Sequence, residues 1–208
     1  LICALTAIPL SAQQTFTDGA GVTYRVEKFL DANFPVGMVF TDDGRLFYTE
    51  KTTGNVRLVH ADGTRQIEPV IHLPTDSLQE RGMLGIALDP DYEANGYIWV
   101  YHTAQATTRD YPTNKIIRFQ EDDGISSDPQ ELLAVPIETG NLLHNGGNLH
   151  FDSEGYLYVG IGDYGESTYS QNLDAPQGKI HRFQVDGDEL IVPDDNPFEG
   201  SSVFAYGF

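Results

Sequence analysis

One pattern of apolar, turn and aromatic residues recurs in three segments of the chain, at residues 36–50, 84–101 and 147–161. Each segment consists of an apolar stretch, a turn rich in Asp and Gly, and a second stretch dense in aromatic and β-branched residues. The first and third segments align without a gap, which places Phe40 on Phe151. Two short stretches rich in strand-forming residues, joined by an Asp- and Gly-rich turn, predict a β-hairpin in each segment.

A second motif follows each predicted hairpin and extends it with a third strand. It is KIIRFQ at residues 115–120 and KIHRFQ at 179–184, with NVRL at 55–58 as a fainter copy. Residues 66–73 and 131–138 predict a fourth strand in two of the units. Four short strands repeated in the same order, without a convincing amphipathic helix, predict the blades of a β-propeller. A β-sandwich is the alternative, but it gives no reason for the repeated order.

The predicted blades are too few to close a propeller. Residues 15–208 hold about three of them, and we expect the strand at residues 201–208 to open a fourth. Propellers close with roughly four to eight blades. The sequence therefore predicts an all-β fold in which residues 15–208 form an incomplete β-propeller.

The first 14 residues, LICALTAIPLSAQQ, are treated apart from this fold. An apolar run followed by small residues is typical of the end of a secretory signal peptide, so we expect a periplasmic or extracellular protein. A buried first strand is the alternative. The only cysteine, Cys3, lies in this segment, so the mature protein is expected to form no disulfide.

Composition narrows the range of partners. The chain has 12 Lys plus Arg against 31 Asp plus Glu, a formal charge of −19, which argues against nucleic acids and anionic membranes as partners. No apolar stretch is long enough to predict a membrane span.

Candidate chemistry lies at the two ends of the third hairpin. His144 precedes its first strand and Asp163 follows its second. If residues 152–155 form a four-residue turn, Phe151 faces Tyr156, and the same ladder makes His144 and Asp163 cross-strand neighbours. A carboxylate that accepts from one imidazole nitrogen leaves the other nitrogen free to act as a general base. The alternative is a purely structural hydrogen bond that ties blades together.

Glycines surround this pair, at positions 146, 147, 160 and 162. Each of them can introduce a β-bulge that shifts the predicted register. Without side chains they also let a flat ligand approach the backbone closely.

Other sites are weaker candidates. The remaining histidines lack a partner at a usable spacing; they are His60, His72, His102, His150 and His181. No paired-histidine motif predicts a transition-metal site. The acidic turns at residues 42–44 and 121–124 are candidates for weak calcium binding, with solvated hairpin tips as the alternative. No GxGxxG motif lies between a strand and a helix, so nicotinamide binding has no support.

Four ordered segments resemble a known family. Residues 79–92, 143–165, 171–183 and 196–208 are similar to the soluble glucose/sorbosone dehydrogenases, which include aldose sugar dehydrogenases that use pyrroloquinoline quinone (PQQ). The resemblance implies a six-bladed β-propeller that binds PQQ and calcium. It implies oxidation of the C1 hydroxyl of an aldose to the lactone, with an external electron acceptor.

The resemblance also implies roles for individual residues. His144 matches the base and Asp163 the aspartate that orients it. Glu80 matches a substrate-contacting position, and Asn172 falls on a loop near the same face. Glu80 stands where the glucose enzymes usually have Gln, and Leu143 replaces a polar residue, so glucose itself is not implied as the substrate.

The resemblance places most of the cofactor's ligands outside these residues. No metal ligand is assigned here, and most ligands of PQQ and calcium lie beyond Phe208 in relatives. The 208 residues alone are therefore expected to bind PQQ poorly and to be inactive. A protein-recognition propeller resembling hedgehog-interacting proteins is the main alternative, and a lactonase or hydrolase with a central metal is another.

Overall fold

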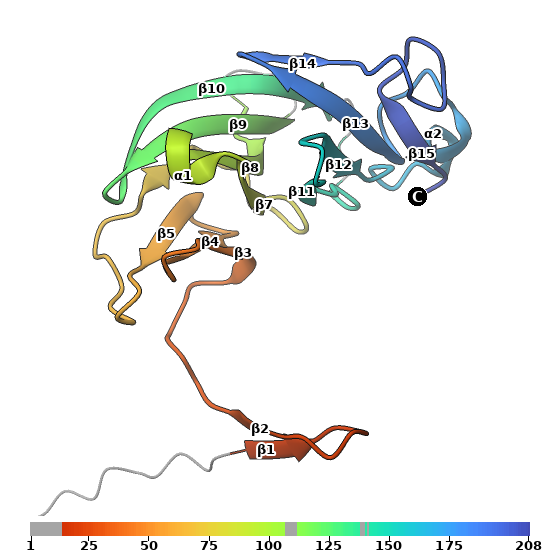
Figure 1. Cartoon of the computed structure of the whole chain (residues 1–208). Helices are drawn as coiled ribbons and strands as arrows, with labels where there is room; N and C mark the ends of the chain where they lie inside the picture. The colour runs from red at the N-terminus through yellow and green to blue at the C-terminus, as the bar shows by residue number, and fades with distance from the viewer. Residues whose placement is uncertain (1–13, 107–111, 138–139, 141) are drawn as a thin grey trace, which may run out of the picture. The chain divides into compact units, whose positions relative to one another are not determined.

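The computed structural model describes residues 14–106, 112–137, 140 and 142–208 (Figure 1). The expected signal peptide lies outside the described residues, apart from Gln14. Within the described part of the chain, no helix is long and apolar enough to cross a membrane.

The described residues before Asn33 belong to a unit of their own. It contains a hairpin of β1 (Gln14–Thr17) and β2 (Thr23–Val26). Asp18 builds the turn, because its Oδ1 accepts hydrogen bonds from the backbone N–H groups of Ala20 and Val22, both at 2.9 Å. The sequence pattern predicted no strand here, and the expected domain start at residue 15 stays a prediction.

The unit that begins at Asn33 contains three antiparallel sheets in its described residues. The first has β3 (Pro35–Phe40), β4 (Leu46–Glu50), β5 (Asn55–Val59) and β6 (Ile71–His72). The second has β7 (Met83–Leu88), β8 (Tyr97–Ala104), β9 (Thr113–Asp122) and β10 (Ile125–Pro136). The third has β11 (Leu149–Phe151), β12 (Leu157–Ile161), β13 (Lys179–Asp186), β14 (Glu189–Ile191) and β15 (Val203–Tyr206).

These strands confirm the predicted all-β class and the predicted order within each unit. The three hairpins are β3–β4, β7–β8 and β11–β12. The KIIRFQ and KIHRFQ motifs lie in β9 and β13, which are the third strands. Two short helices, α1 (Tyr92–Asn95) and α2 (Ser167–Gln171), lie in connections. The number of blades in the whole protein stays a prediction.

The prediction that residues 201–208 open a fourth blade is wrong. β15 pairs with β13 inside the third sheet, with Lys179 opposite Tyr206. The reason is that β14 is shorter than β13 and pairs only with its last part, from Gln184 to Asp186. The first half of β13 keeps a free edge, and β15 fills it and buries Val203.

Neighbouring sheets pack through their first strands. β3 and β4 contact β7, and β11 contacts β7 and β8. One cluster of buried side chains includes Phe47 and Phe119 from the first two sheets, and another includes Trp99 and Leu157 from the second and third. The β11–β12 hairpin therefore rests on the second sheet, which matters for the candidate site.

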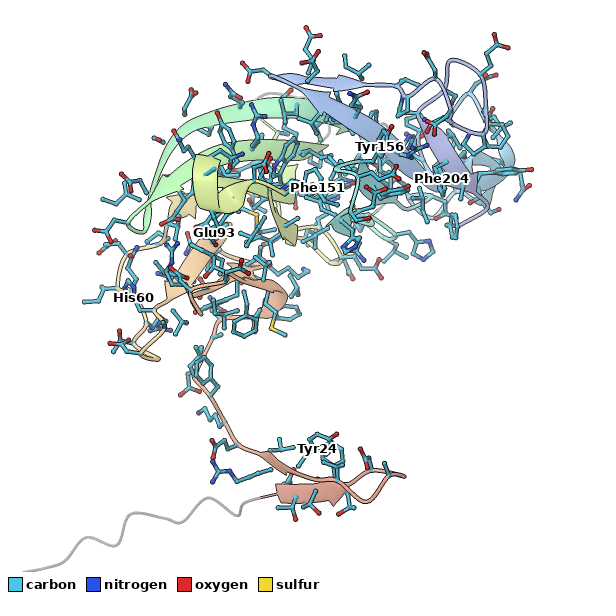
Figure 2. The ribbon with its side chains drawn as sticks, in the orientation of Figure 1. Tyr24, His60, Glu93, Phe151, Tyr156 and Phe204 are labelled. Carbon is cyan, nitrogen blue, oxygen red and sulfur yellow. The ribbon has the colours of Figure 1, made fainter. Side chains whose placement is uncertain are left out.

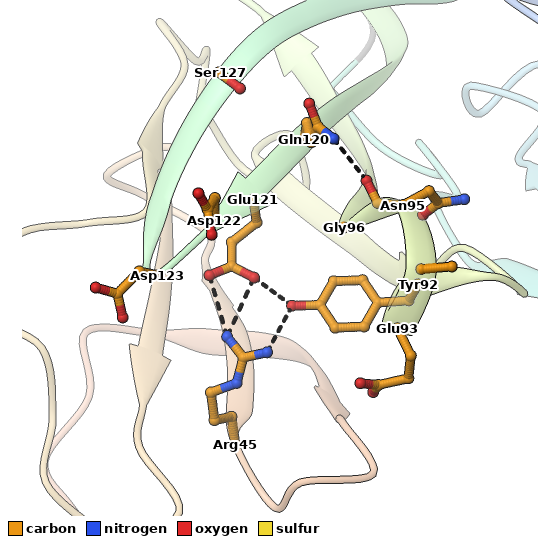
Figure 3. Close-up of a pocket in the computed structure, with 11 residues that line it drawn as sticks. Arg45, Tyr92, Glu93, Asn95, Gly96, Gln120, Glu121, Asp122, Asp123 and Ser127 are labelled. Carbon is orange, nitrogen blue, oxygen red and sulfur yellow. Dashed lines mark hydrogen bonds and ion pairs between the residues drawn. The ribbon is translucent and has the colours of Figure 1, made fainter.

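Arginines add polar contacts between sheets. Arg45, in the β3–β4 turn of the first sheet, binds Glu121 of the second at 3.2 Å, and Glu121 also accepts a hydrogen bond from the Tyr92 hydroxyl (Figure 3). Arg118 of β9 donates to the carbonyl of Gly187, in the β13–β14 turn, at 2.8 Å. Within the third sheet, the Arg182 guanidinium lies 3.9 Å from the ring centroid of Tyr156, which directly precedes β12 (Figure 2).

Candidate active site

His144 and Asp163 are in direct contact. Nδ1 of His144 lies 2.7 Å from Oδ1 of Asp163, a hydrogen-bonding distance. The imidazole is 55% exposed, whereas the Asp163 side chain is only 14% exposed. The carboxylate is thus held at the protein surface while the ring that it binds remains accessible.

The turn between the two strands differs from the one predicted. The ladder pairs Phe151 with Leu157 rather than with Tyr156. Asp152 N–H bonds the carbonyl of Tyr156, so the turn holds three residues, and Gly155 takes the left-handed conformation that this turn needs, with φ +83°. This register alone would not place His144 opposite Asp163.

A bulge next to the pair restores the contact. The N–H of Gly160 bonds the carbonyl of Asn148 at 3.0 Å, and the carbonyl of Gly160 accepts from Gly147 N–H at 2.8 Å. Two consecutive residues of one chain segment therefore face a single residue of the other, which shifts the pairing by one position. Gly147 has φ +112°, which a residue with a side chain rarely adopts. The turn is one residue shorter than predicted and the bulge adds one residue, so the two changes cancel and the side chains of His144 and Asp163 meet.

Glu80 holds the backbone of His144. His144 has φ +53°, an uncommon value for a residue other than glycine. Its N–H donates to Oε2 of Glu80 at 2.6 Å. Glu80 lies in the connection between β6 and β7, 64 residues away, so sequence spacing could not predict this contact.

The surrounding charges shift the pKa values of the pair in opposite directions. The hydrogen bond to Asp163 raises the pKa of His144 above its ordinary 6.5, with help from the charges of Asp163 and Glu80. Burial pushes the pKa of Asp163 upward, but the bonds from His144 and from Gly165 N–H outweigh it, so this pKa falls below 3.8.

These shifts fix how the pair contributes to stability. The raised His144 pKa stabilises the folded state below pH 6.5, and this contribution is lost as pH rises through the folded-state pKa. The lowered Asp163 pKa stabilises the folded state above pH 3.8 and is lost as pH falls through the folded-state pKa.

Replacing Asp163 by asparagine is expected to lower the pKa of His144 toward 6.5. The amide oxygen can still accept from Nδ1, but the negative charge that favours imidazolium is gone. The measurement is an NMR titration of the His144 ring. Asp152→Asn, in the turn of the same hairpin, is the control and should leave this pKa in place. An unchanged pKa in Asp163→Asn would show that the contact is absent in solution.

A cavity of about 310 Å³ adjoins the pair. It is lined by Gly146, Asn148, Gly160, Ile161, Gly162, Lys179, Ile180 and Phe208. A Cβ at Gly160 would meet no atom closer than 4.0 Å, so a side chain there would extend into open space. The φ of Gly160 lies outside the left-handed region, so its backbone does not require glycine.

Lys179 is the one cation among the residues that line this cavity. It is almost fully buried, and its ammonium group donates to the carbonyl oxygens of Tyr169, Ser170 and Gln177. Its three donors are thus directed to the backbone.

Among the described residues, no hydrogen bond or ion pair connects Asn172 to His144 or Asp163. It ends α2, where its N–H bonds the carbonyl of Tyr169. Its side-chain oxygen accepts from Asp174 N–H at 3.1 Å. The residue is exposed, and these bonds shape its own turn.

Three of the weaker candidates have partners away from the His144 site. Asp43 binds Arg45 in its own turn, and Glu121 binds the same arginine. His102 is buried beside Thr75, and burial lowers its pKa to about 4. Among the described residues, no three His, Cys, Asp or Glu side chains gather closely enough to hold a metal ion.

The sequence reasoning missed a buried set of polar side chains beneath the pair. It comprises Tyr101, Thr103, Asn114, Asn145 and Tyr164. The only sequence signal was indirect, since Asn145 follows His144 and Tyr164 follows Asp163.

Comparison with known proteins gives a consistent picture. The profile of the glucose/sorbosone dehydrogenase family matches residues 32–208. The chain is 31% identical to human Hedgehog-interacting protein over 201 residues, which cover 83% of this chain and 29% of that protein. It is 24% identical to quinoprotein glucose dehydrogenase B of Acinetobacter calcoaceticus over 238 residues, covering 99% of this chain and 48% of that enzyme.

A solved structure is also similar. The PQQ-bound aldose sugar dehydrogenase of Streptomyces coelicolor aligns with a TM-score of 0.73 and 29% identity, over 85% of this chain and 51% of that one. The chain thus spans about half the length of these two dehydrogenases and under a third of Hedgehog-interacting protein. The antiparallel sheets match those of propeller-type sugar dehydrogenases.

Proposed function

The chain belongs to the glucose/sorbosone dehydrogenase family, and from the geometry of the His144–Asp163 pair we propose that the full-length protein is a quinoprotein oxidoreductase. It oxidises the C1 hydroxyl of an aldose sugar to the lactone and passes the electrons to an external acceptor. The observation that carries the proposal is the 2.7 Å contact between His144 and Asp163 beside an open cavity.

His144 is the proposed general base. The bond to Asp163 occupies Nδ1 and favours the tautomer that carries its proton there, which leaves the lone pair of Nε2 to accept a proton. The ring is more than half exposed, so a sugar hydroxyl can reach it. Asp163 orients the ring and stabilises the imidazolium that forms when the sugar hydroxyl loses its proton.

The cavity beside the pair suits one side of a planar cofactor. Three of the residues that line it are glycines, and a side chain at Gly160 would occupy open space that a flat ring could use. When bound, PQQ supplies the hydride acceptor and calcium polarises it. The described residues hold the proposed base and these glycines.

The charge of PQQ requires cations that these residues lack. PQQ carries three carboxylates, and an uncompensated anion in a partly desolvated site is costly. Lys179 is already engaged by backbone carbonyls. We therefore place most ligands of PQQ and calcium after Phe208, in the further blades of a six-bladed propeller.

Two other residues complete the proposed site. Glu80 and Asn172 contact substrate or cofactor in this proposal, Glu80 because it matches a family position that contacts substrate, and Asn172 because the resemblance places it on a loop near the same face. The position of Glu80 against His144 supports its part. Residues 1–14 are a partial signal peptide in the same proposal, and the protein acts in the periplasm or outside the cell.

The test is reconstitution of the full-length protein with PQQ and calcium, followed by dye reduction with a panel of aldoses. We expect reduction that depends on both PQQ and sugar. No reduction with any aldose, in protein shown to be folded, would overturn the proposal. It would favour the second candidate, a recognition propeller, which the 31% identity to Hedgehog-interacting protein supports.

A further inference from the structure

A buried asparagine lies beneath the His144–Asp163 pair. Asn114 is on β9 of the second sheet and is 1% exposed. Its Nδ2 donates to Oδ1 of Asn145 at 3.2 Å and to the hydroxyl of Tyr164 at 3.0 Å. Its Oδ1 accepts from the Thr103 hydroxyl at 2.7 Å. Both donors and the acceptor of this amide are therefore used.

The two bonds from Nδ2 reach both halves of the pair. Asn145 directly follows His144, and Tyr164 directly follows Asp163. The two bonded side chains belong to the segments that flank the β11–β12 hairpin. One amide group of the second sheet thus spans the base of the site and holds its two sides at a set separation.

The backbone at these two segments needs such support. His144 has φ +53° and Tyr164 has φ +56°. A non-glycine residue in this region costs of order 1 kcal/mol or more and persists only when its surroundings hold it. The Tyr101 hydroxyl adds a bond to the backbone carbonyl of Asn145 at 2.9 Å. Tyr101 and Thr103 both lie on β8, so the support comes from the second sheet.

The buried position of Asn114 requires a side chain with both donors and an acceptor, which an amide provides. Asn114, Thr103 and Tyr164 are each buried to within 1% exposure. Removing one partner from such a network leaves another polar group without water or protein to bind, at a cost of roughly 1–3 kcal/mol. Leucine has no donor, and aspartate replaces the two N–H donors by an acceptor, so neither preserves the arrangement.

We infer that Asn114 is a positioning residue for the His144–Asp163 pair, acting through Asn145 and Tyr164. It keeps the Asp163 carboxylate on Nδ1 of His144 without touching either side chain. The catalytic meaning of this role rests on the proposed function, but the positioning itself does not.

The experiment compares Asn114→Ala with Asn196→Ala. Asn196 is a matched control because it is also buried, and its amide bonds the carbonyls of Arg182 and Ser201 away from the pair. In the 208-residue chain, the NMR-titrated pKa of His144 is expected to fall toward 6.5 in Asn114→Ala and to stay in Asn196→Ala. In the loaded full-length protein, Asn114→Ala should lower kcat by roughly tenfold or more with little change in KM.

Tyr164→Phe keeps the test decisive if Asn114→Ala does not fold. It removes only the hydroxyl that Asn114 binds and should lower the His144 pKa in the same direction. An unchanged His144 pKa in the folded variant would overturn the inference, as would an equal fall in Asn196→Ala. The proposed function fails separately: if His144→Ala keeps full turnover, the dehydrogenase base is wrong while the positioning result stands.

Discussion

Replacement of His144 by alanine is expected to lower kcat/KM of the PQQ- and calcium-loaded full-length protein by about 10²–10⁴-fold, the usual contribution of a positioned general base. Without the imidazole, the C1 hydroxyl of the sugar has no base to take its proton. The measurement is dye reduction at saturating and limiting sugar. In the unmodified protein, kcat/KM should rise with pH as His144 loses its proton.

The fold should survive this change. The His144 side chain is 55% exposed, so alanine removes little packing. His150→Ala is the control, because this histidine is exposed on β11 of the same hairpin and is assigned no role. His150→Ala should keep its turnover. Full activity in His144→Ala, or equal loss in both variants, would refute the assignment of His144 as the base.

Replacement of Gly85 by alanine is expected to lower the free energy of unfolding by about 3 kcal/mol, the upper end of the usual range for overpacking. Gly85 lies on β7, and a Cβ there would lie 1.8 Å from the carbonyl oxygen of Gly147. That oxygen belongs to the backbone of the bulge beside the His144 site, so it cannot move away by a simple rotamer change. β7 and the bulge would have to separate.

Urea denaturation of the 208-residue chain measures this effect. Gly160→Ala is the matched control, because the added Cβ would meet no atom closer than 4.0 Å and should change stability by no more than about 0.5 kcal/mol. Equal stability of Gly85→Ala and the unmodified protein would mean that the second sheet and the bulge are not in contact in solution. In the folded fraction of Gly85→Ala, the His144 pKa should also lie closer to 6.5.

The two variants separate chemistry from support. His144→Ala removes the proposed base and leaves its surroundings, whereas Gly85→Ala leaves the imidazole and disturbs the backbone that holds it. Glu80 and Asn114 hold the same segment from the β6–β7 connection and from β9. Contacts from β7, from the β6–β7 connection and from β9 can together keep the backbone of His144 in an uncommon conformation while its imidazole stays exposed.

The strands themselves were predictable from the sequence. The three hairpins and the third strands form where the strand-forming stretches, the turn residues and the repeated motifs predict them. His144 and Asp163 were also a reasonable pair, because both ends of one hairpin come together whenever the hairpin forms. Local sequence carries this information, since it depends only on backbone preferences and on residues a few positions apart.

What only the tertiary structure decided concerns partners and register. A strand-forming stretch does not say which edge it joins, so the sequence predicts a new blade at residues 201–208, although β15 joins the free edge of β13. The sequence also does not fix the number of turn residues or the position of the bulge, because several glycines are compatible with both the predicted and the observed register. The bonds of Glu80 and Asn114 to this segment span 64 and 31 residues. Such contacts arise from the packing of one sheet on the next, and no local pattern encodes them.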